Sequence, residues 1–173
     1  MDLKALLVVD MLMDFIDPEG ALYIGSTAED LVPAVEAKIE QFRSEGQPII
    51  FICDHHLEDD SEFAMFPPHS LSGSKGAEII PALAPQSGER VIYKRRYSAF
   101  FGTDLDLTLR EKRICDIELV GCVTNICILY TAVHARMLDY NVTVPVAAVA
   151  GFDPEAHRFA LREMEKTLGV TLA

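Results

Sequence analysis

Three side chains in this chain have the chemistry of a nucleophile, a base and a cation: Cys127, Asp10 and Lys94. A thiol that attacks a carbonyl group needs a base to accept its proton and a positive field to hold the thiolate. Asp10 can be that base if burial raises its pKa, and Lys94 can stabilise both the thiolate and the carboxylate. Taken singly, the three have ordinary alternatives: a core cysteine, a capping or salt-bridged aspartate, and a solvated lysine. Their convergence at one place in the fold would favour catalysis.

The segment around Cys127, residues 117–135, predicts a strand, a tight turn and the start of a helix. An apolar run, 117–120, reaches Gly121, and the polar turn 122–125 follows. Cys127 then lies in the first helical turn, near the positive end of the helix dipole. We expect this position to lower the pKa of the thiol and to favour the thiolate. The N–H groups of the turn can point at one position and form an oxyanion hole.

The segment after the second predicted strand carries side chains of the kinds that bind metal ions: Asp54, His55, His56, Glu62 and His69. Imidazole nitrogen and carboxylate oxygen are ligands of zinc, with iron or manganese as alternatives. Asp54 and His56 are two residues apart, so in an extended segment they share a face from which His55 points away. A metal-free surface loop that is rich in histidine and acids is the alternative.

Aromatic residues in the same loops could line an apolar pocket around these polar groups: Phe15, Phe66, Tyr97 and Phe100. An apolar pocket with a few placed polar groups is typical of a small-molecule site. Packing in the core is the alternative for each ring. The two remaining histidines, His134 and His157, lie on predicted helices and are expected to be structural or exposed.

The length and composition indicate a single domain over residues 1–173 with a sizeable core, since hydrophobic residues make up 50% of the chain. The net charge of −12 argues against a nucleic-acid-binding protein, which would need a basic surface. No stretch approaches the roughly 18 consecutive apolar residues that a membrane span needs. The four cysteines have no C-x-x-C spacing and no secretion signal precedes them, so we expect reduced thiols in the cytoplasm.

Apolar strands and periodic helices alternate along the chain. The predicted strands are 3–9, 48–53, 91–93, 117–120, 142–149 and 170–172, and the predicted helices are 28–43, 104–112, one from about 126, and one after Asp153. This pattern predicts an α/β fold, a three-layer αβα sandwich with a central, mostly parallel sheet of the Rossmann-like kind. Ligands of such sheets bind beyond the carboxyl ends of the strands. Asp10, Asp54, Lys94 and the turn before Cys127 each follow a predicted strand, so we expect them at one edge of the sheet.

The chain resembles the cysteine hydrolases of the isochorismatase-like superfamily, and within it the nicotinamidases and pyrazinamidases. The resemblance covers nearly the whole length and rests on five segments in order: LLVVD, DHH, FPPHSLSGSKGAE, YKRRYSAFFGTDLDLTLRE and VGCVTNICILYTAVHA. FPPH with the following G-x-x-G-A-E, together with K-x-x-Y-S-A-F, points to nicotinamidases in particular. The resemblance implies the isochorismatase-like fold.

The resemblance also implies roles for the residues of the cysteine cluster. Asp10 would be the general base, Lys94 the electrostatic partner and Cys127 the nucleophile. A cis peptide bond is implied between Val123 and Thr124, which would turn the N–H groups of Thr124 and Cys127 toward the oxyanion. Many members carry an acid after this threonine, where the chain has Asn125. That difference removes a charge near the nucleophile.

The loop residues match the family's metal and substrate sites. Asp54, His56 and His69 match the three protein ligands of a divalent metal, which we expect to be zinc, with iron or manganese as alternatives. Glu62 stands where some members supply a further carboxylate ligand. The aromatic clamp on the substrate would be formed by three rings: Phe15, Phe66 and Tyr97.

The implied reaction is the hydrolysis of nicotinamide to nicotinate and ammonia, a step of NAD salvage, in a cytoplasmic homo-oligomer. One alternative is a related cysteine hydrolase that acts on another small amide, or on a vinyl ether as isochorismatases do. The vinyl ether reaction does not use the cysteine, so a functional metal-binding loop at FPPH would argue against it. Another alternative is a non-catalytic binding module of the same fold. The presence of Asp10, Lys94 and Cys127 argues against such a module.

Overall fold

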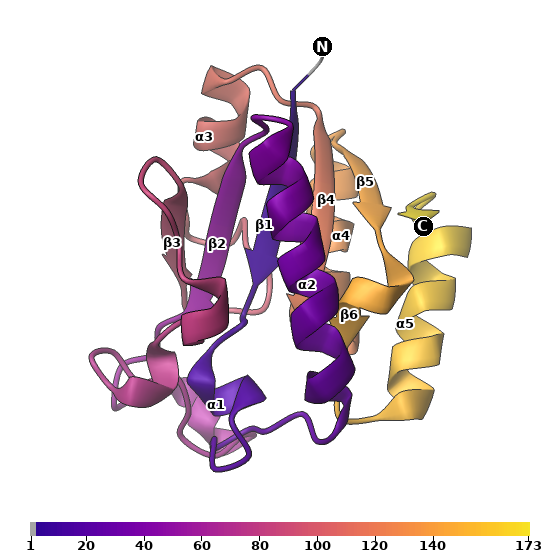
Figure 1. Cartoon of the computed structure of the whole chain (residues 1–173). Coiled ribbons are helices and arrows are strands. Elements are labelled where there is room, and N and C mark those ends of the chain that lie inside the picture. Colours follow the sequence, from indigo (N-terminus) through magenta and orange to yellow (C-terminus); the bar gives the residue numbers. More distant parts are fainter. Residues whose placement is uncertain (1–2) are drawn as a thin grey trace.

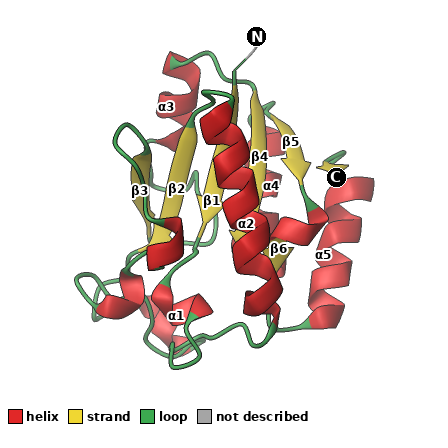
Figure 2. Cartoon of the chain, in the orientation of Figure 1, coloured by secondary structure: helices red, strands yellow, loops and turns green. Residues whose placement is uncertain are grey.

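The computed structural model describes residues 3–173 and shows a central sheet with helices on both faces (Figures 1 and 2). Residues 1 and 2 of the expected domain lie outside the described residues. The strands are β1 (Lys4–Val9), β2 (Ile49–Asp54), β3 (Arg90–Lys94), β4 (Asp116–Cys122), β5 (Asn141–Val144), β6 (Val149–Ala150) and β7 (Thr171–Leu172). The α-helices are α1 (Met13–Ile16), α2 (Thr27–Ser44), α3 (Leu105–Glu111), α4 (Leu129–Met137) and α5 (Pro154–Lys166).

The sheet is seven-stranded, in the order β3-β2-β1-β4-β5-β7, with β6 paired to the end of β4. Every strand pair is parallel. The central strands are therefore buried on both faces, which is why they read as unbroken apolar runs in the sequence.

Alternate residues of β1 belong to different halves of the core, because successive side chains of a strand point to opposite faces. Ala5, Leu7 and Val9 pack with buried residues of α3, α4 and α5, whereas Leu6 and Val8 pack with buried residues of α2. Figure 1 shows α2 in front of the sheet and α4 behind it. The predicted three-layer αβα sandwich with a parallel sheet is thus confirmed.

Two predicted elements differ in detail from the structure. The single strand expected over 142–149 is divided into β5 and β6 by Pro145 and a 3₁₀ turn, Val146–Ala148. Proline lacks the N–H that a ladder needs, so the strand stops at this residue and resumes after the turn. The helix expected from about residue 126 begins instead with a π-helical turn, Thr124–Ile128, that leads into α4.

The carboxyl ends of β1, β2, β3 and β4 lie at one edge of the sheet. In the register of β2 and β3, Asp54 is paired with Lys94, and in the register of β1 and β4, Val9 is paired with Gly121. The polar residues that end or follow these strands therefore meet, as expected from the sequence. None of the helices formed by residues 3–173 has the length and apolar character of a membrane span.

Candidate active site and metal-binding cluster

Lys94 lies between the side chains of Asp10 and Cys127, and all three are buried. Its Nζ is 2.9 Å from Asp10 Oδ2 and 3.4 Å from Cys127 Sγ. Asp10 follows β1 with a φ of +50°, a left-handed conformation that aspartate adopts more readily than most residues. This conformation places Asp10 Oδ1 where it accepts a hydrogen bond of 2.8 Å from the N–H of Asp54, so the side chain is held from two sides.

The protonation of this cluster follows from burial and charge. Burial raises the pKa of Asp10 to about 6, the Asp54 carboxylate adds to the rise, and Lys94 opposes it. Asp10 is therefore mostly ionised at neutral pH, yet basic enough to accept a proton. Burial alone would lower the pKa of Lys94, but the carboxylates of Asp10 and Asp54 raise it well above the usual value. Lys94 is consequently a permanent cation beside the thiol.

The expected low pKa of Cys127 is wrong in this structure. Burial raises the pKa of the thiol well above its usual value, and the Asp10 and Asp54 carboxylates raise it further, against the lowering effect of Lys94. Taking a thiolate out of water is costly, so burial disfavours the anionic form. Cys127 therefore rests as a thiol next to an ionised Asp10.

The turn before Cys127 holds a non-proline cis peptide bond, but between Cys122 and Val123. The prediction of a cis bond between Val123 and Thr124 is therefore wrong by one residue. Cys122 is the last residue of β4 and pairs with Ala150 of β6, so the cis bond directly follows the strand.

The hydrogen bonds of the π-helical turn do not join the Cys127 N–H to the Val123 carbonyl. Val123 O accepts hydrogen bonds from the N–H groups of Ile126 (3.0 Å) and Ile128 (3.2 Å) rather than from that of Cys127. The first N–H groups of a helix have no partner within the helix. Thr124 is held through its side chain, because Oγ1 is 2.9 Å from Nδ1 of His157 on α5. His157, expected to be structural or exposed, thus contacts the turn, and no local sequence pattern indicates this.

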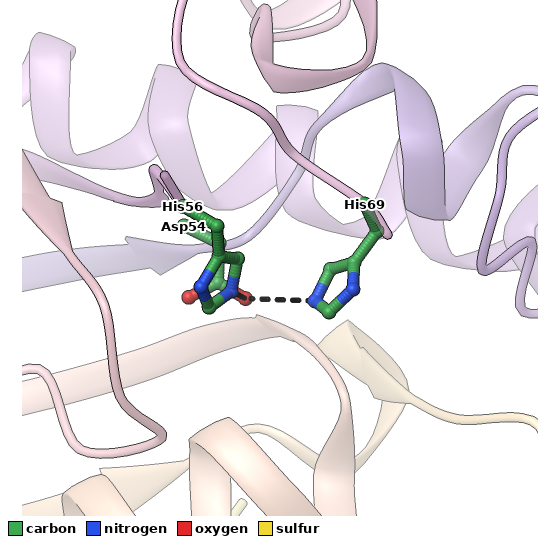
Figure 3. A group of neighbouring side chains, drawn as sticks. All are labelled: Asp54, His56 and His69. Carbon is green, nitrogen blue, oxygen red and sulfur yellow. Dashed lines mark ion pairs between the residues drawn. The ribbon is translucent and has the colours of Figure 1, made fainter. Parts of the chain in front are cut away.

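A second cluster, Asp54, His56 and His69, lies beside the first (Figure 3). Each offers a donor atom within 4.8 Å of the others, and the Nε2 atoms of His56 and His69 are 3.7 and 3.8 Å from Asp54 Oδ2. Two ligands about 2.0–2.2 Å from one zinc ion are roughly 3–4 Å apart, so these spacings fit a shared divalent cation. Among the described residues, no group hydrogen-bonds to the buried Nε2 of His56, as a ligand atom requires.

Glu62 and His55, the other two metal-ligand candidates of this loop, do not belong to the cluster of Asp54, His56 and His69. Glu62 is buried and lines a pocket together with Asp54 and His69. Its carboxylate does not belong to the group of donor atoms that Asp54, His56 and His69 form. His55 points away as expected, with Nε2 2.7 Å from Ser72 Oγ and its ring against Tyr93.

A pocket joins the two clusters. Its lining includes the aromatic residues expected from the sequence: Phe15, Phe66 and Tyr97. Cys127 and His69 line it as well, and so do four apolar residues that the sequence did not indicate: Leu22, Val123, Ile126 and Phe152. Phe100 does not line it, because it packs in the core against His134 and Tyr140. Phe100 precedes helix α3, so the helical periodicity of that segment does not show whether its side chain points into the core or into the pocket.

Asp14 was also missed by sequence reasoning, although it holds the loop that carries His69. Its Oδ2 accepts from the N–H of Ser70 at 2.6 Å, and its Oδ1 accepts from the N–H of Ala21 at 3.1 Å. A Cβ on Gly76 would lie 2.1 Å from Asp14 Oδ2, so this glycine is needed for a close approach. The contact with Ser70 spans 56 positions in the sequence, so no local pattern indicates it.

Residues 4–173 match the family model of the isochorismatase domain. Among solved structures, the chain is similar to nicotinamidase PncA from Bacillus subtilis, with 35% identity, a TM-score of 0.94 and 98% of each chain covered. It is similar to N-carbamoylsarcosine amidase from Thermoplasma acidophilum, with 35% identity, a TM-score of 0.90, and 99% of this chain and 95% of that chain covered. Pyrazinamidase of Pyrococcus horikoshii in complex with zinc is 31% identical, with a TM-score of 0.91 and 98% of each chain covered.

Proposed function

The chain belongs to the isochorismatase family, a family of hydrolases, and from this premise we propose that it hydrolyses nicotinamide to nicotinate and ammonia. The observation that carries the proposal is the position of Asp54 between the two clusters. Its Oδ1 accepts a hydrogen bond from Lys94, and its Oδ2 faces the Nε2 atoms of His56 and His69. A ligand held at the histidines is therefore close to the thiol.

The first half of the proposed reaction transfers the acyl group to Cys127. Asp10 accepts the thiol proton while Sγ attacks the carboxamide carbon, and the electron pair of the C=O bond moves to oxygen. The N–H group of Cys127, which does not donate to the carbonyl oxygen of Val123, stabilises this oxyanion. Asp10 then gives its proton to the amide nitrogen, the C–N bond breaks, and ammonia leaves a thioester on Cys127.

The second half regenerates the thiol. Asp10 takes a proton from water, the hydroxide oxygen attacks the thioester carbon, and the C–S bond breaks. The sulfur recovers its proton from Asp10, and the released acid ionises to nicotinate. A pKa of about 6 suits Asp10 to both proton transfers, because it accepts at neutral pH without holding the proton strongly. Lys94 remains protonated and stabilises negative charge on the sulfur.

The pocket suits a flat heteroaromatic amide. The aromatic side chains of Phe15, Phe66 and Tyr97 line it together with Cys127. A divalent ion held by Asp54, His56 and His69 would offer a coordination position to a pyridine nitrogen and would thereby fix the ring. The similarity to a pyrazinamidase in complex with zinc supports zinc as the ion.

A second candidate is hydrolysis of a different small amide by the same cysteine chemistry. It is favoured by the similarity to N-carbamoylsarcosine amidase, which has the same 35% identity as the Bacillus subtilis nicotinamidase. The aromatic lining favours a planar ring over an extended aliphatic amide. Nicotinamide is thus the first substrate to test.

Ammonia release from nicotinamide, pyrazinamide, benzamide and N-carbamoylsarcosine would test the proposal. We expect turnover of the first two, and weak turnover of benzamide because its ring has no nitrogen to coordinate. Removing the metal with a chelator should raise KM on the order of tenfold or more, with a smaller effect on kcat. The reason is that a contact between the metal and the ring would stabilise the bound substrate and the transition state equally. Fast hydrolysis of N-carbamoylsarcosine without turnover of nicotinamide would establish the second candidate instead.

A further inference from the structure

Asp60 is a buried carboxylate that the proposed reaction does not use. Its side chain is 0% exposed and has polar contacts on both oxygens. Oδ1 accepts from the N–H of Glu62 at 3.2 Å and from Nη1 of Arg96 at 3.0 Å. Oδ2 accepts from Nε of Arg95 at 3.0 Å and lies 3.1 Å from Nδ1 of His56. A carboxylate surrounded in this way has few orientations available.

The chemistry of the partners determines the direction of the bond to His56. A backbone N–H and a guanidinium N–H can only donate, so Asp60 acts as an ionised acceptor toward Glu62, Arg95 and Arg96. The remaining contact then requires that His56 Nδ1 carries a proton and donates it. The lone pair of the neutral ring is left on Nε2, which faces Asp54 Oδ2 and has no hydrogen-bond partner in the described part of the chain.

The two arginines directly follow the strand that ends with Lys94. Arg95 and Arg96 follow Lys94 directly at the end of β3, whereas Asp60 precedes a 3₁₀ turn, Ser61–Ala64, in the long loop after β2. The ion pairs of 3.0 Å therefore tie this loop to the sheet edge. By charge alone, two guanidinium groups near a cation site would weaken cation binding. A benefit to metal binding must come from the orientation that they impose on Asp60.

We propose that Asp60 is a positioning residue of the metal site, which fixes the ring of His56 with Nε2 as the ligand atom, and that Arg95 and Arg96 hold Asp60 in place. The inference rests on the metal site of the proposed function. It concerns the affinity for the ion and the ligand atom, and so it is tested on binding rather than on turnover.

The first test is the affinity of the full-length protein for Zn²⁺, measured by competition with a chromogenic chelator. Asp60→Asn should weaken zinc binding by roughly 10- to 100-fold, the usual effect of losing a carboxylate behind a ligating histidine. Asp59→Asn is the matched control, because it removes the same charge from the adjacent exposed position. We expect its zinc affinity to stay within about twofold of the wild type, since an exposed charge is screened by salt.

Removing both arginines gives a second test, because their charge and their effect on the orientation of Asp60 predict opposite changes in zinc affinity. If they act only through their charge, the double variant Arg95→Ala/Arg96→Ala should bind zinc more tightly than the wild type. We expect it to bind zinc more weakly, because Asp60 loses two of the donors that orient it. Tighter binding would overturn the role assigned to the arginines.

The ligand atom of His56 is read from the wild-type protein, so this test does not depend on a variant that folds. In the zinc-loaded protein, ¹⁵N NMR of the His56 ring should show a protonated Nδ1 and a metal-bound Nε2. A metal-bound Nδ1, or zinc affinity of Asp60→Asn equal to that of the wild type, would overturn the proposal. Failure of the wild type itself to bind zinc would instead contradict the metal site of the proposed function.

Discussion

Asp54 uses its two oxygens for different purposes. Oδ1 accepts a hydrogen bond from Lys94 and Oδ2 faces the two histidines, so one buried side chain takes part in both clusters. Lys94 lowers the pKa of Asp54 well below its usual range, against the burial that would raise it. The carboxylate is thus available as an anionic ligand without losing its contact with the lysine. Neutralising it is expected to disturb metal binding and thiol chemistry together.

At the residue scale, the nucleophile is the first prediction to test. Cys127→Ala should lower kcat by at least about 10³-fold, since removing a nucleophile eliminates the covalent route. The chain offers a matched control in Cys115, an exposed free cysteine that does not line the pocket. Cys115→Ala should keep kcat near the wild-type value when ammonia release is measured under the same conditions. Full activity in Cys127→Ala would show that the proposed mechanism is wrong.

At the scale of elements, the active site depends on how closely β4 approaches β1. Gly121 has a φ of +113°, and a Cβ at this position would lie 2.0 Å from the carbonyl oxygen of Val9. The turn before Cys127 and the segment that carries Asp10 follow these two positions directly. The glycine therefore brings the strand ends together at the point where the two side chains must meet.

Gly121→Ala should be strongly destabilising, by about 3 kcal/mol or more in the free energy of unfolding, because the backbone of a central strand must move. Gly88 is a matched control, with a φ of +93° and no atom within 4 Å of the point that a Cβ would occupy. Gly88→Ala should cost only about 1–2 kcal/mol, the effect of a left-handed backbone without a clash. Urea denaturation of both variants measures the difference, and equal losses would contradict the close-approach argument.

Helix α5 is the element that supports the turn through His157, and its start is determined by local chemistry. Asp153 Oδ1 accepts hydrogen bonds from the N–H groups of Glu155 (2.8 Å) and Ala156 (3.2 Å), with Pro154 in the first helical position. This is the cap that the sequence predicts. Asp153→Ala should lower the free energy of unfolding by about 1 kcal/mol. Arg158→Ala, on the exposed side of the same helix, should change it by less than about 0.5 kcal/mol, as judged by urea denaturation.

At the scale of the whole molecule, a metal ion that binds only the folded chain should raise its stability. Asp54 ends β2 and His56 follows it closely, whereas His69 lies more than ten residues farther along the chain, so unfolding separates His69 from the other two. At free zinc about 100 times its Kd, binding adds about 2.7 kcal/mol to the free energy of unfolding. The melting temperature of the wild-type protein should therefore rise when zinc is added.

Neighbouring histidines provide the variants for this prediction. His56→Ala should lose most of the zinc-dependent rise in Tm, because it removes a ligand. His55→Ala should retain the rise, because this ring points away from the cluster toward Ser72 and Tyr93. The quantity compared is the change in Tm on adding zinc, so any effect of the substitution on the metal-free protein cancels. An equal rise in both variants would contradict the assigned ligands.

Much of the architecture could be predicted from the sequence, because it depends on local periodicity. Apolar runs predicted the buried parallel strands, and the positions of Asp10, Asp54 and Lys94 at strand ends predicted that they would meet at one edge of the sheet. Pairs of residues two apart predicted that Asp54 and His56 would share a face while His55 would not. These inferences need only the geometry of a strand and the rule that parallel strands end together.

Tertiary structure decided the features that depend on contacts distant in sequence. The pKa of the Cys127 thiol is raised because burial and two carboxylates outweigh the lysine, and these contacts cannot be inferred from a position in a helix. The cis peptide bond lies one residue earlier than expected, between Cys122 and Val123. The hydrogen bonds of Asp60, which orient His56, also join separate segments. The sequence determined which residues are candidates for the chemistry, whereas only the packed fold decided their protonation and their contacts, because these depend on burial and on distances across the chain.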